Sequence, residues 1–148
     1  MKAERFDELC LEFQQVLEKH IRPGIREHLR KARKAGDTLC IISASPENWI
    51  RPWAEKEGVD TVLATRLDTD SDGRLTGRFA TPNCSGKEKV VRLLAAFPDL
   101  QNNRKNYTLY VYGDSSGDKP LIDFADRGWY VLKAGNTCPR EKVKSMIN

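Results

Sequence analysis

Apolar residues near the amino-terminal end of the chain recur every three or four positions between residues 5 and 20. This spacing predicts a helix with a single buried stripe. The stripe consists of Phe6, Leu9, Cys10, Phe13, Val16 and Leu17. A helix of this kind needs a surface to pack against, so we expect it to cover a core built by later segments.

Helices and strands are then expected to alternate. In the first half, the pattern predicts a helix over residues 23–35, a buried strand over 38–43 and a strand over 61–64. Between these strands it predicts a helix with Ser45 as its cap and Pro46 as its first position, which Pro52 interrupts. Ser71-Asp72-Gly73 is a strong hairpin turn. In the second half, Ser85 and Glu88 form a capping-box pattern before a helix, and strands are expected at 107–112 and 129–132.

This alternation, broken by one hairpin, predicts an α/β fold with a largely parallel sheet that helices cover on both faces. The 148 residues suffice for one domain with its own core. We therefore expect a single domain over residues 1–148.

Charge and cysteine content narrow the function classes. The net charge of +4 is modest, and the basic residues between Lys19 and Lys34 are not interleaved with aromatic residues, so we expect a solvated helix face and no nucleic-acid partner. No apolar stretch approaches membrane length, so we expect no stable membrane insertion. The four cysteines are widely spaced and lack zinc-site patterns, which favours a cytoplasmic location.

Two apolar runs end in polar groups. Residues 39–42 are followed by Ser43-Ala44-Ser45, and residues 109–112 by Gly113-Asp114-Ser115-Ser116-Gly117-Asp118. In open α/β sheets, ligands bind at the carboxyl ends of strands, where loop amides, helix N-termini and side chains converge. The sequence therefore predicts a ligand site built from these two segments.

Together with Gly86-Lys87-Glu88-Lys89-Val90, these segments resemble motifs two, three and four of the haloacid dehalogenase (HAD) superfamily in order and spacing. Residues 64–67, 72–77 and 83–84 also look like its phosphoserine-phosphatase-like branch, so the resemblance runs from about Gly24 to Leu132. It implies a Rossmann-like, three-layer α/β/α core with a β-hairpin insertion.

The resemblance also implies a chemistry. In that family, a carboxylate attacks a small phosphate monoester to give an aspartyl-phosphate, and Mg²⁺ neutralises phosphoryl oxygens. Asp114 would be a metal ligand, and Asp118 a second carboxylate that binds or orients the metal shell. Ser43 would donate a hydrogen bond to the phosphoryl group. The motif-three lysine would be Lys89 or Lys87, and the spacing slightly favours Lys89.

Each of these residues also has a purely structural interpretation. Asp114 and Asp118 suit turn and cap positions, Ser43 suits a strand end, and the lysines suit a solvated helix face. Gly117 departs from the family, because many relatives carry asparagine or threonine there.

Motif one is the larger departure. The family's nucleophile lies in an hhhhDxDx(T/V) segment on the central strand, and the sequence has no such segment. Asp68-Thr69-Asp70-Ser71-Asp72-Gly73 has DxD spacing but falls in the predicted hairpin, so we assign it to a turn. We therefore expect an HAD-type phosphatase that is inactive as this chain alone. The alternative is a non-catalytic pseudoenzyme or a binding or assembly module.

The missing strand also affects the expected architecture. Residues 1–22 resemble the remnant of a helical cap or a linker helix, 23–134 the core, and 135–148 a tail helix. Without the central strand, we expect residues 38–43 to pair directly with residues 107–112, or a second chain to cover the gap. The second case would give a homodimer through the exposed inner strand edge or the N-terminal helix.

Overall fold

The computed structural model describes residues 1–22, 24–132 and 137–139. It divides into two compact units, Met1–Cys84 and Ser85–Asn148, and each is described by itself. The single domain expected from the chain length stays a prediction.

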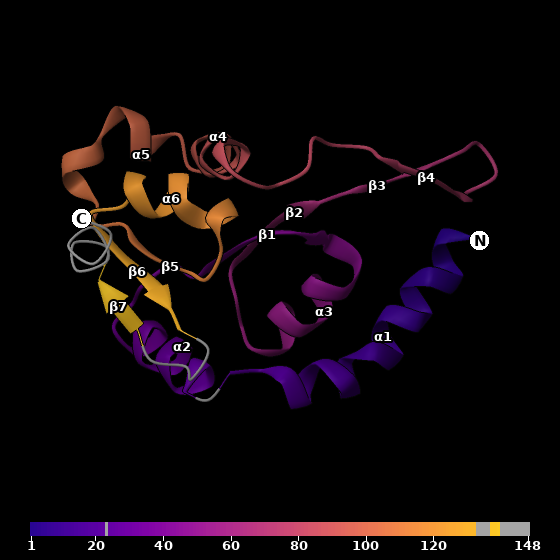
Figure 1. The fold of residues 1–148 in the computed structure, drawn as a ribbon, viewed down its shortest axis with the longest axis horizontal. Coiled ribbons are helices and arrows are strands. Elements are labelled where there is room, and N and C mark those ends of the chain that lie inside the picture. The colour runs from indigo at the N-terminus through magenta and orange to yellow at the C-terminus, as the bar shows by residue number, and fades with distance from the viewer. Residues whose placement is uncertain (23, 133–136, 140–148) are drawn as a thin grey trace. The chain divides into compact units, whose positions relative to one another are not determined.

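The first unit is built around a parallel strand pair. Its elements are α1 (Ala3–His20), α2 (Ile25–Lys34), β1 (Cys40–Pro46), α3 (Glu47–Lys56), β2 (Thr61–Thr65), β3 (Leu67–Thr69) and β4 (Leu75–Phe79). Strand β1 pairs with β2 in parallel, and α3 packs on this pair (Figure 1). The buried centre consists of Ala54, Val62 and Ala64, with Ile41, Ile50 and Val59 against it.

The helix predicted from the amino-terminal apolar stripe is confirmed as α1. It packs on α3, where the ring centroid of Trp49 lies 6.4 Å from that of Phe6 and 6.3 Å from that of Phe13. The stripe is only partly covered, because Cys10 is buried whereas Phe13 and Val16 remain exposed.

The helix after β1 differs from its prediction at two residues, the expected cap Ser45 and the expected interruption Pro52. Ser45 does not cap it, because Ser45 and Pro46 still belong to β1 and α3 begins at Glu47. Pro52 does not interrupt it either. The two residues that follow Pro52, Trp53 and Ala54, are buried, so packing outweighs the loss of one helical hydrogen bond.

The predicted hairpin is confirmed as the antiparallel pair β3–β4. Asp70 Oδ1 accepts hydrogen bonds from the amides of Asp72 (3.0 Å) and Arg74 (2.8 Å), and Gly73 has a φ of 71°. A carboxylate in this position stabilises the turn. The assignment of the DxD segment to a turn is therefore confirmed.

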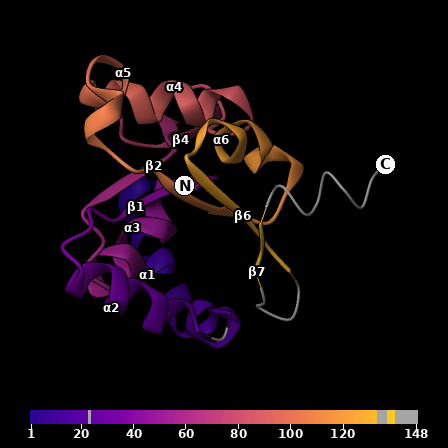
Figure 2. The ribbon, with the colours of Figure 1, turned by 90° about the vertical axis from the view of Figure 1, so that its left-hand side faces the viewer.

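The second unit carries a three-stranded sheet under helices. Its elements are α4 (Lys87–Ala96), α5 (Asp99–Asn102), η1 (Arg104–Asn106), β5 (Tyr110–Gly113), η2 (Ser116–Asp118), α6 (Lys119–Phe124), β6 (Arg127–Val131) and β7 (Thr137–Pro139). Strand β5 pairs with β6 in parallel, and β6 with β7 antiparallel. Helix α6 lies against β5 and β6 and also packs on α4 (Figure 2).

Three expectations for the chain's secondary structure are corrected. Residues 38–43 do not pair with 107–112, because β1 bonds to β2 and β5 to β6 in separate sheets. The Ser85–Glu88 capping box does not form; Gly86 is the N-cap of α4, with no side-chain cap. Thr137–Pro139, expected in a tail helix, forms strand β7 because it pairs with β6, and residues 140–148 of that predicted helix lie outside the described residues.

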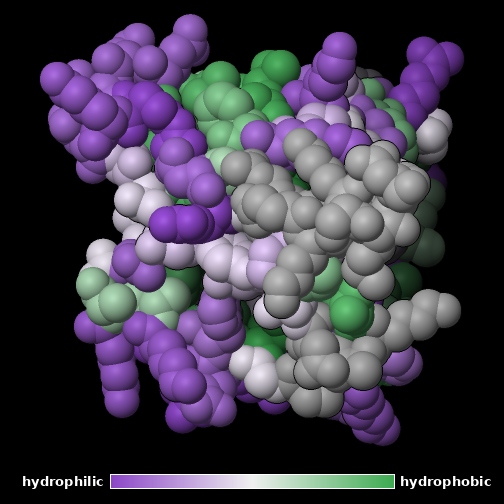
Figure 3. All heavy atoms as spheres, turned by 60° about the vertical axis from the view of Figure 1, so that its left-hand side comes forward, coloured by the Kyte–Doolittle hydropathy of each residue, from purple (hydrophilic) through white to green (hydrophobic). Residues whose placement is uncertain are grey.

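Polar residues dominate the molecular surface drawn in Figure 3, where hydrophobic residues form smaller patches. Within the described ranges, no helix combines the length and apolar character needed to cross a membrane.

The strand pairings confirm the α/β architecture with parallel strand pairs and a hairpin insertion.

Candidate active site

A short loop at the carboxyl end of β5 is organised around the Asp118 carboxylate. Its Oδ2 accepts hydrogen bonds from the amides of Asp114 and Ser115, both at 3.0 Å, and from Ser115 Oγ at 2.8 Å. Ser115 and Asp118 thereby form a reciprocal cap at the start of η2. The loop that presents Asp114 is therefore held by a neighbouring side chain.

The other Asp118 oxygen binds a lysine. Lys89, in the first turn of α4, places Nζ 2.6 Å from Asp118 Oδ1. Both residues are buried, with 6% and 9% of their surface exposed. A charge removed from water is costly unless it is paired and hydrogen-bonded. Asp118 and Lys89 therefore depend on each other.

Burial and pairing act in opposite directions on Asp118. Burial raises the pKa of this carboxyl, but the hydrogen bonds from Lys89 and Ser115 and the charge of Lys89 outweigh burial. The net effect holds the pKa of Asp118 below its ordinary value. The group is therefore ionised at neutral pH and attracts the Lys89 ammonium.

This direction predicts an acid-sensitive contribution to stability. A lowered pKa in the folded state stabilises the protein above the pKa of the unfolded chain, about 3.9, and the contribution is lost as pH falls through the folded-state pKa. We expect Asp118→Asn to be strongly destabilised at pH 7, and its deficit against the wild type to shrink below about pH 4. Urea unfolding between pH 3 and 7 measures this, with Asp123→Asn as a surface control. A deficit independent of pH would contradict the assignment.

Two glycines allow the loop to pack this closely. A Cβ on Gly113 would lie 2.4 Å from Asp118 Cβ and 2.8 Å from its Cγ. A Cβ on Gly117 would lie 2.6 Å from Ser85 Oγ, where the Gly117 carbonyl accepts the Gly86 amide at 2.9 Å. The absence of a side chain at residue 117 therefore leaves room for Ser85 before α4.

Ser43 belongs to the first unit and lies near the carboxyl end of β1. Its Oγ accepts a hydrogen bond from the Ser45 amide at 3.1 Å. A hydroxyl that accepts a bond can still donate its hydrogen. In the part of the chain that the structure describes, no acceptor for that hydrogen is found, so Ser43 can donate to a ligand.

Asp114 lies exposed in the loop after β5, next to Gly113, the last residue of that strand. A carboxylate there suits a hard cation such as Mg²⁺, which commonly uses one or two carboxylates plus water and phosphate oxygens. Asp118 suits that role less well, since both of its oxygens already accept hydrogen bonds. Residues 1–22, 24–132 and 137–139 contain no group of three or more potential metal ligands among His, Cys, Asp and Glu.

Comparison with known proteins identifies the family. The model of the haloacid dehalogenase-like hydrolases matches residues 1–123. The chain belongs to this family. The resemblance drawn from motifs two, three and four is thereby confirmed.

Individual proteins also match the chain in sequence. The chain is 35% identical over 116 residues to protein CicA of Caulobacter vibrioides, covering 78% of this chain and 50% of CicA. It is 32% identical over 104 residues to a histidinol-phosphatase of Neisseria meningitidis serogroup C, covering 70% and 47%. The chain thus spans about half the length of the curated relatives it matches.

Solved structures share the HAD fold. A protein of unknown function from Bordetella pertussis Tohama I superposes with a TM-score of 0.76 at 25% identity, covering 86% of this chain and 58% of that one. Phosphoserine phosphatases and similar proteins also match, at 18–21% identity, where the likeness concerns the fold.

Of the two candidate lysines for HAD motif three, only one lies in this cluster. Lys89 is buried on Asp118, whereas Lys87 is exposed at the start of α4. The sequence favours Lys89 only slightly and gives no role to Gly113 or Ser115. The Ser-x-x-Asp spacing of residues 115–118 was the available signal for the reciprocal cap.

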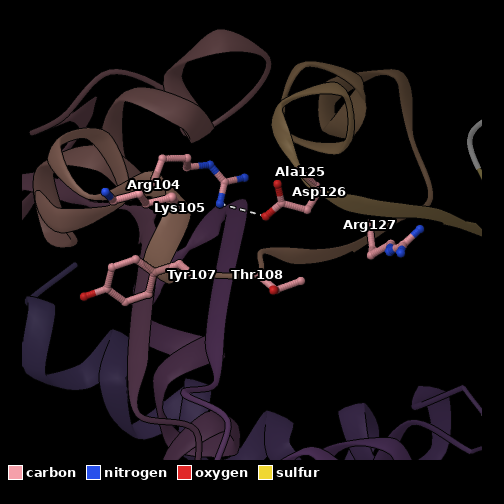
Figure 4. Close-up of a pocket in the computed structure, with 7 residues that line it drawn as sticks. All are labelled: Arg104, Lys105, Tyr107, Thr108, Ala125, Asp126 and Arg127. Atoms are coloured by element: carbon pink, nitrogen blue, oxygen red, sulfur yellow. Dashed lines mark ion pairs between the residues drawn. The ribbon is translucent and has the colours of Figure 1, made fainter.

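A hollow in the second unit lies at the other end of its sheet. It is lined by residues before β5 and around the start of β6, including Arg104, Lys105, Asp126 and Arg127. Figure 4 shows Arg104 turned toward Asp126, with which it forms a 2.8 Å ion pair, while Lys105 and Arg127 point in different directions. The basic groups do not converge on one point, so the hollow lacks the form of an anion site.

Proposed function

We propose that the chain is part of a Mg²⁺-dependent HAD phosphatase that hydrolyses a small phosphate monoester through an aspartyl-phosphate. The observation that carries this proposal is the buried Lys89–Asp118 pair beside Asp114 at the end of β5. Family membership and the likeness to a histidinol-phosphatase support it. We also propose a cytoplasmic location, in keeping with four cysteines that form no disulfide.

Each residue has a distinct role in this proposal. Lys89 offsets the negative charge that accumulates on the phosphoryl group, and Asp118 holds the Lys89 ammonium in place. Ser43 donates its hydroxyl hydrogen to a phosphoryl oxygen. Asp114 would hold Mg²⁺, and the ion would supply positive charge to offset the negative charge of the phosphoryl oxygens. Lys87 is the solvent-exposed alternative to Lys89.

The attacking carboxylate is not among these residues. The sequence has no motif-one DxDx(T/V) segment, and a covalent nucleophile contributes far more to rate than the groups that assist it. We therefore expect this chain alone to show no Mg²⁺-dependent hydrolysis of para-nitrophenyl phosphate above the buffer rate. Steady-state assays with and without EDTA measure this.

The matched control for that assay is Asp114→Asn. Turnover in the wild type that disappears in Asp114→Asn would contradict the expectation, because it would show that another residue acts as nucleophile. Phosphate binding without turnover agrees equally with the non-catalytic module and with a phosphatase whose nucleophile is supplied elsewhere.

The homodimer expected from the sequence stays a prediction that light scattering can test.

A further inference from the structure

Thr65 is a completely buried polar residue that the proposed chemistry does not use. It is the last residue of β2 and has 0% of its surface exposed. Its hydroxyl oxygen lies 2.9 Å from the Ala44 carbonyl oxygen, 3.2 Å from Asn83 Oδ1 and 3.0 Å from the Cys84 amide. One side chain therefore connects β2, the end of β1 and the segment that leads out of the hairpin.

The contact with Ala44 falls where β1 departs from regular pairing. Ser43 is opposite Ala64, but the next paired residue, Pro46, is opposite Thr65. Strand β1 thus advances three residues while β2 advances one, and Ala44 and Ser45 form a bulge. Bulges redirect side chains and are frequent next to active sites. A backbone carbonyl in a bulge lacks its regular ladder partner, and Thr65 supplies a hydroxyl to Ala44.

The hydrogen-bonding capacity of the Thr65 hydroxyl matches these neighbours. A hydroxyl donates one hydrogen and accepts two. The Cys84 amide donates to it, and Ala44, the nearer of the two oxygens, is its better acceptor. Because the group is buried, removing the hydroxyl would take away its hydrogen bonds to the Ala44 carbonyl and the Cys84 amide, which is costly.

Ser43 depends on the same bulge. Its hydroxyl is oriented by the amide of Ser45, and both residues flank Ala44. If the Ala44 carbonyl is not held, the Ser45 amide is no longer fixed relative to Ser43 Oγ. The direction in which Ser43 donates its hydrogen would then be lost.

We propose that Thr65 is a positioning residue that holds the 43–45 bulge so that Ser43 donates to a phosphoryl oxygen. The inference rests on the proposed function, because it assigns the ligand of Ser43 as a phosphate. Thr65 touches no reacting group and acts through Ala44.

The test compares two substitutions at the same site. Thr65→Val keeps the shape but removes the hydroxyl, whereas Thr65→Ser keeps the hydroxyl. Thr61→Val, at the opposite end of β2, controls for the same change where no side-chain hydrogen bond is described. Inorganic phosphate is titrated into each ¹⁵N-labelled protein with Mg²⁺ present, and the amide shifts of residues 43–45 give the dissociation constant. Working well below the melting temperature of every variant separates affinity from stability.

We expect Thr65→Val to weaken phosphate binding about tenfold or more, as removal of an orienting partner typically does. Thr65→Ser and Thr61→Val should bind like the wild type. Amide hydrogen exchange, measured without phosphate, should be faster at Ser45 in Thr65→Val alone. This second measurement reports the bulge itself and does not depend on a ligand.

The outcomes separate the two claims. Equal phosphate affinity in Thr65→Val and the wild type, or unchanged exchange at Ser45, overturns the positioning role and leaves the proposed function standing. If the wild type gives no shifts at residues 43–45, the phosphate role of Ser43 fails. Faster amide exchange at Ser45 in Thr65→Val alone would then still support the claim that Thr65 stabilises the bulge at residues 43–45.

Discussion

Replacing Lys89 by methionine is expected to destabilise the protein by about 3–5 kcal/mol, because it leaves the buried Asp118 carboxylate without its counter-charge. Methionine preserves most of the side-chain volume, so the loss reports the charge rather than a cavity. This is a large part of the total stability of an ordinary domain, about 5–15 kcal/mol. Urea unfolding at pH 7 measures it.

Lys87→Met is the matched control for this prediction. Lys87 belongs to the same turn of α4 but is exposed, so its replacement should change stability by no more than about 0.5 kcal/mol. Combining Lys89→Met with Asp118→Asn should recover part of the loss, since no buried charge then remains and the amide oxygen can still accept hydrogen bonds from the Asp114 and Ser115 amides. A Lys89→Met protein as stable as Lys87→Met would show that the ion pair is not buried.

Gly113→Ala is expected to cost about 1–3 kcal/mol and to displace the Asp118 carboxylate from Lys89. The new methyl would lie 2.4 Å from Asp118 Cβ, which is fixed by its own backbone and cannot rotate away. Either β5 or the loop after it must move. Thermal unfolding gives the cost, and a loss of the acid-dependent stability assigned to Asp118 reports the displacement.

Gly117→Ala is the control for Gly113→Ala, because it also places a methyl group too close to a neighbouring atom. There the methyl meets Ser85 Oγ at 2.6 Å, the end of a side chain that can rotate. We expect a smaller loss of stability than for Gly113→Ala. Equal losses at the two sites would contradict the view that Asp118 is the rigid obstacle.

The order of elements was predictable because hydrophobic spacing reports which faces are buried. Local pattern predicted the stripe on α1 and the hairpin turn at Gly73. It also predicted strands at 38–43 and 107–112, which overlap β1 and β5. The strand-end position of Asp114 also followed, since this residue comes directly after the apolar run that forms β5.

Local sequence patterns did not predict those features that depend on contacts between distant residues. Pro52 lies inside α3 because Trp53 and Ala54 are buried, and a propensity scale has no access to that burial. Ser85 and Glu88 match a capping box, yet Gly86 caps α4, and the reciprocal cap forms at Ser115 instead. The spacing favours Lys89 over Lys87 only slightly, because the choice depends on which lysine reaches Asp118.

We propose that the loop after β5 forms the metal and phosphate side of an HAD phosphatase site. Phosphate titration of the ¹⁵N-labelled chain with and without Mg²⁺, following the amides of residues 113–118 in the wild type and in Asp114→Asn, tests this role most directly. We predict weak binding of Mg²⁺ alone, phosphate binding that Mg²⁺ strengthens in the wild type, and loss of that strengthening in Asp114→Asn. Tight Mg²⁺ binding without phosphate, or identical phosphate affinities in the two proteins, would contradict the claim.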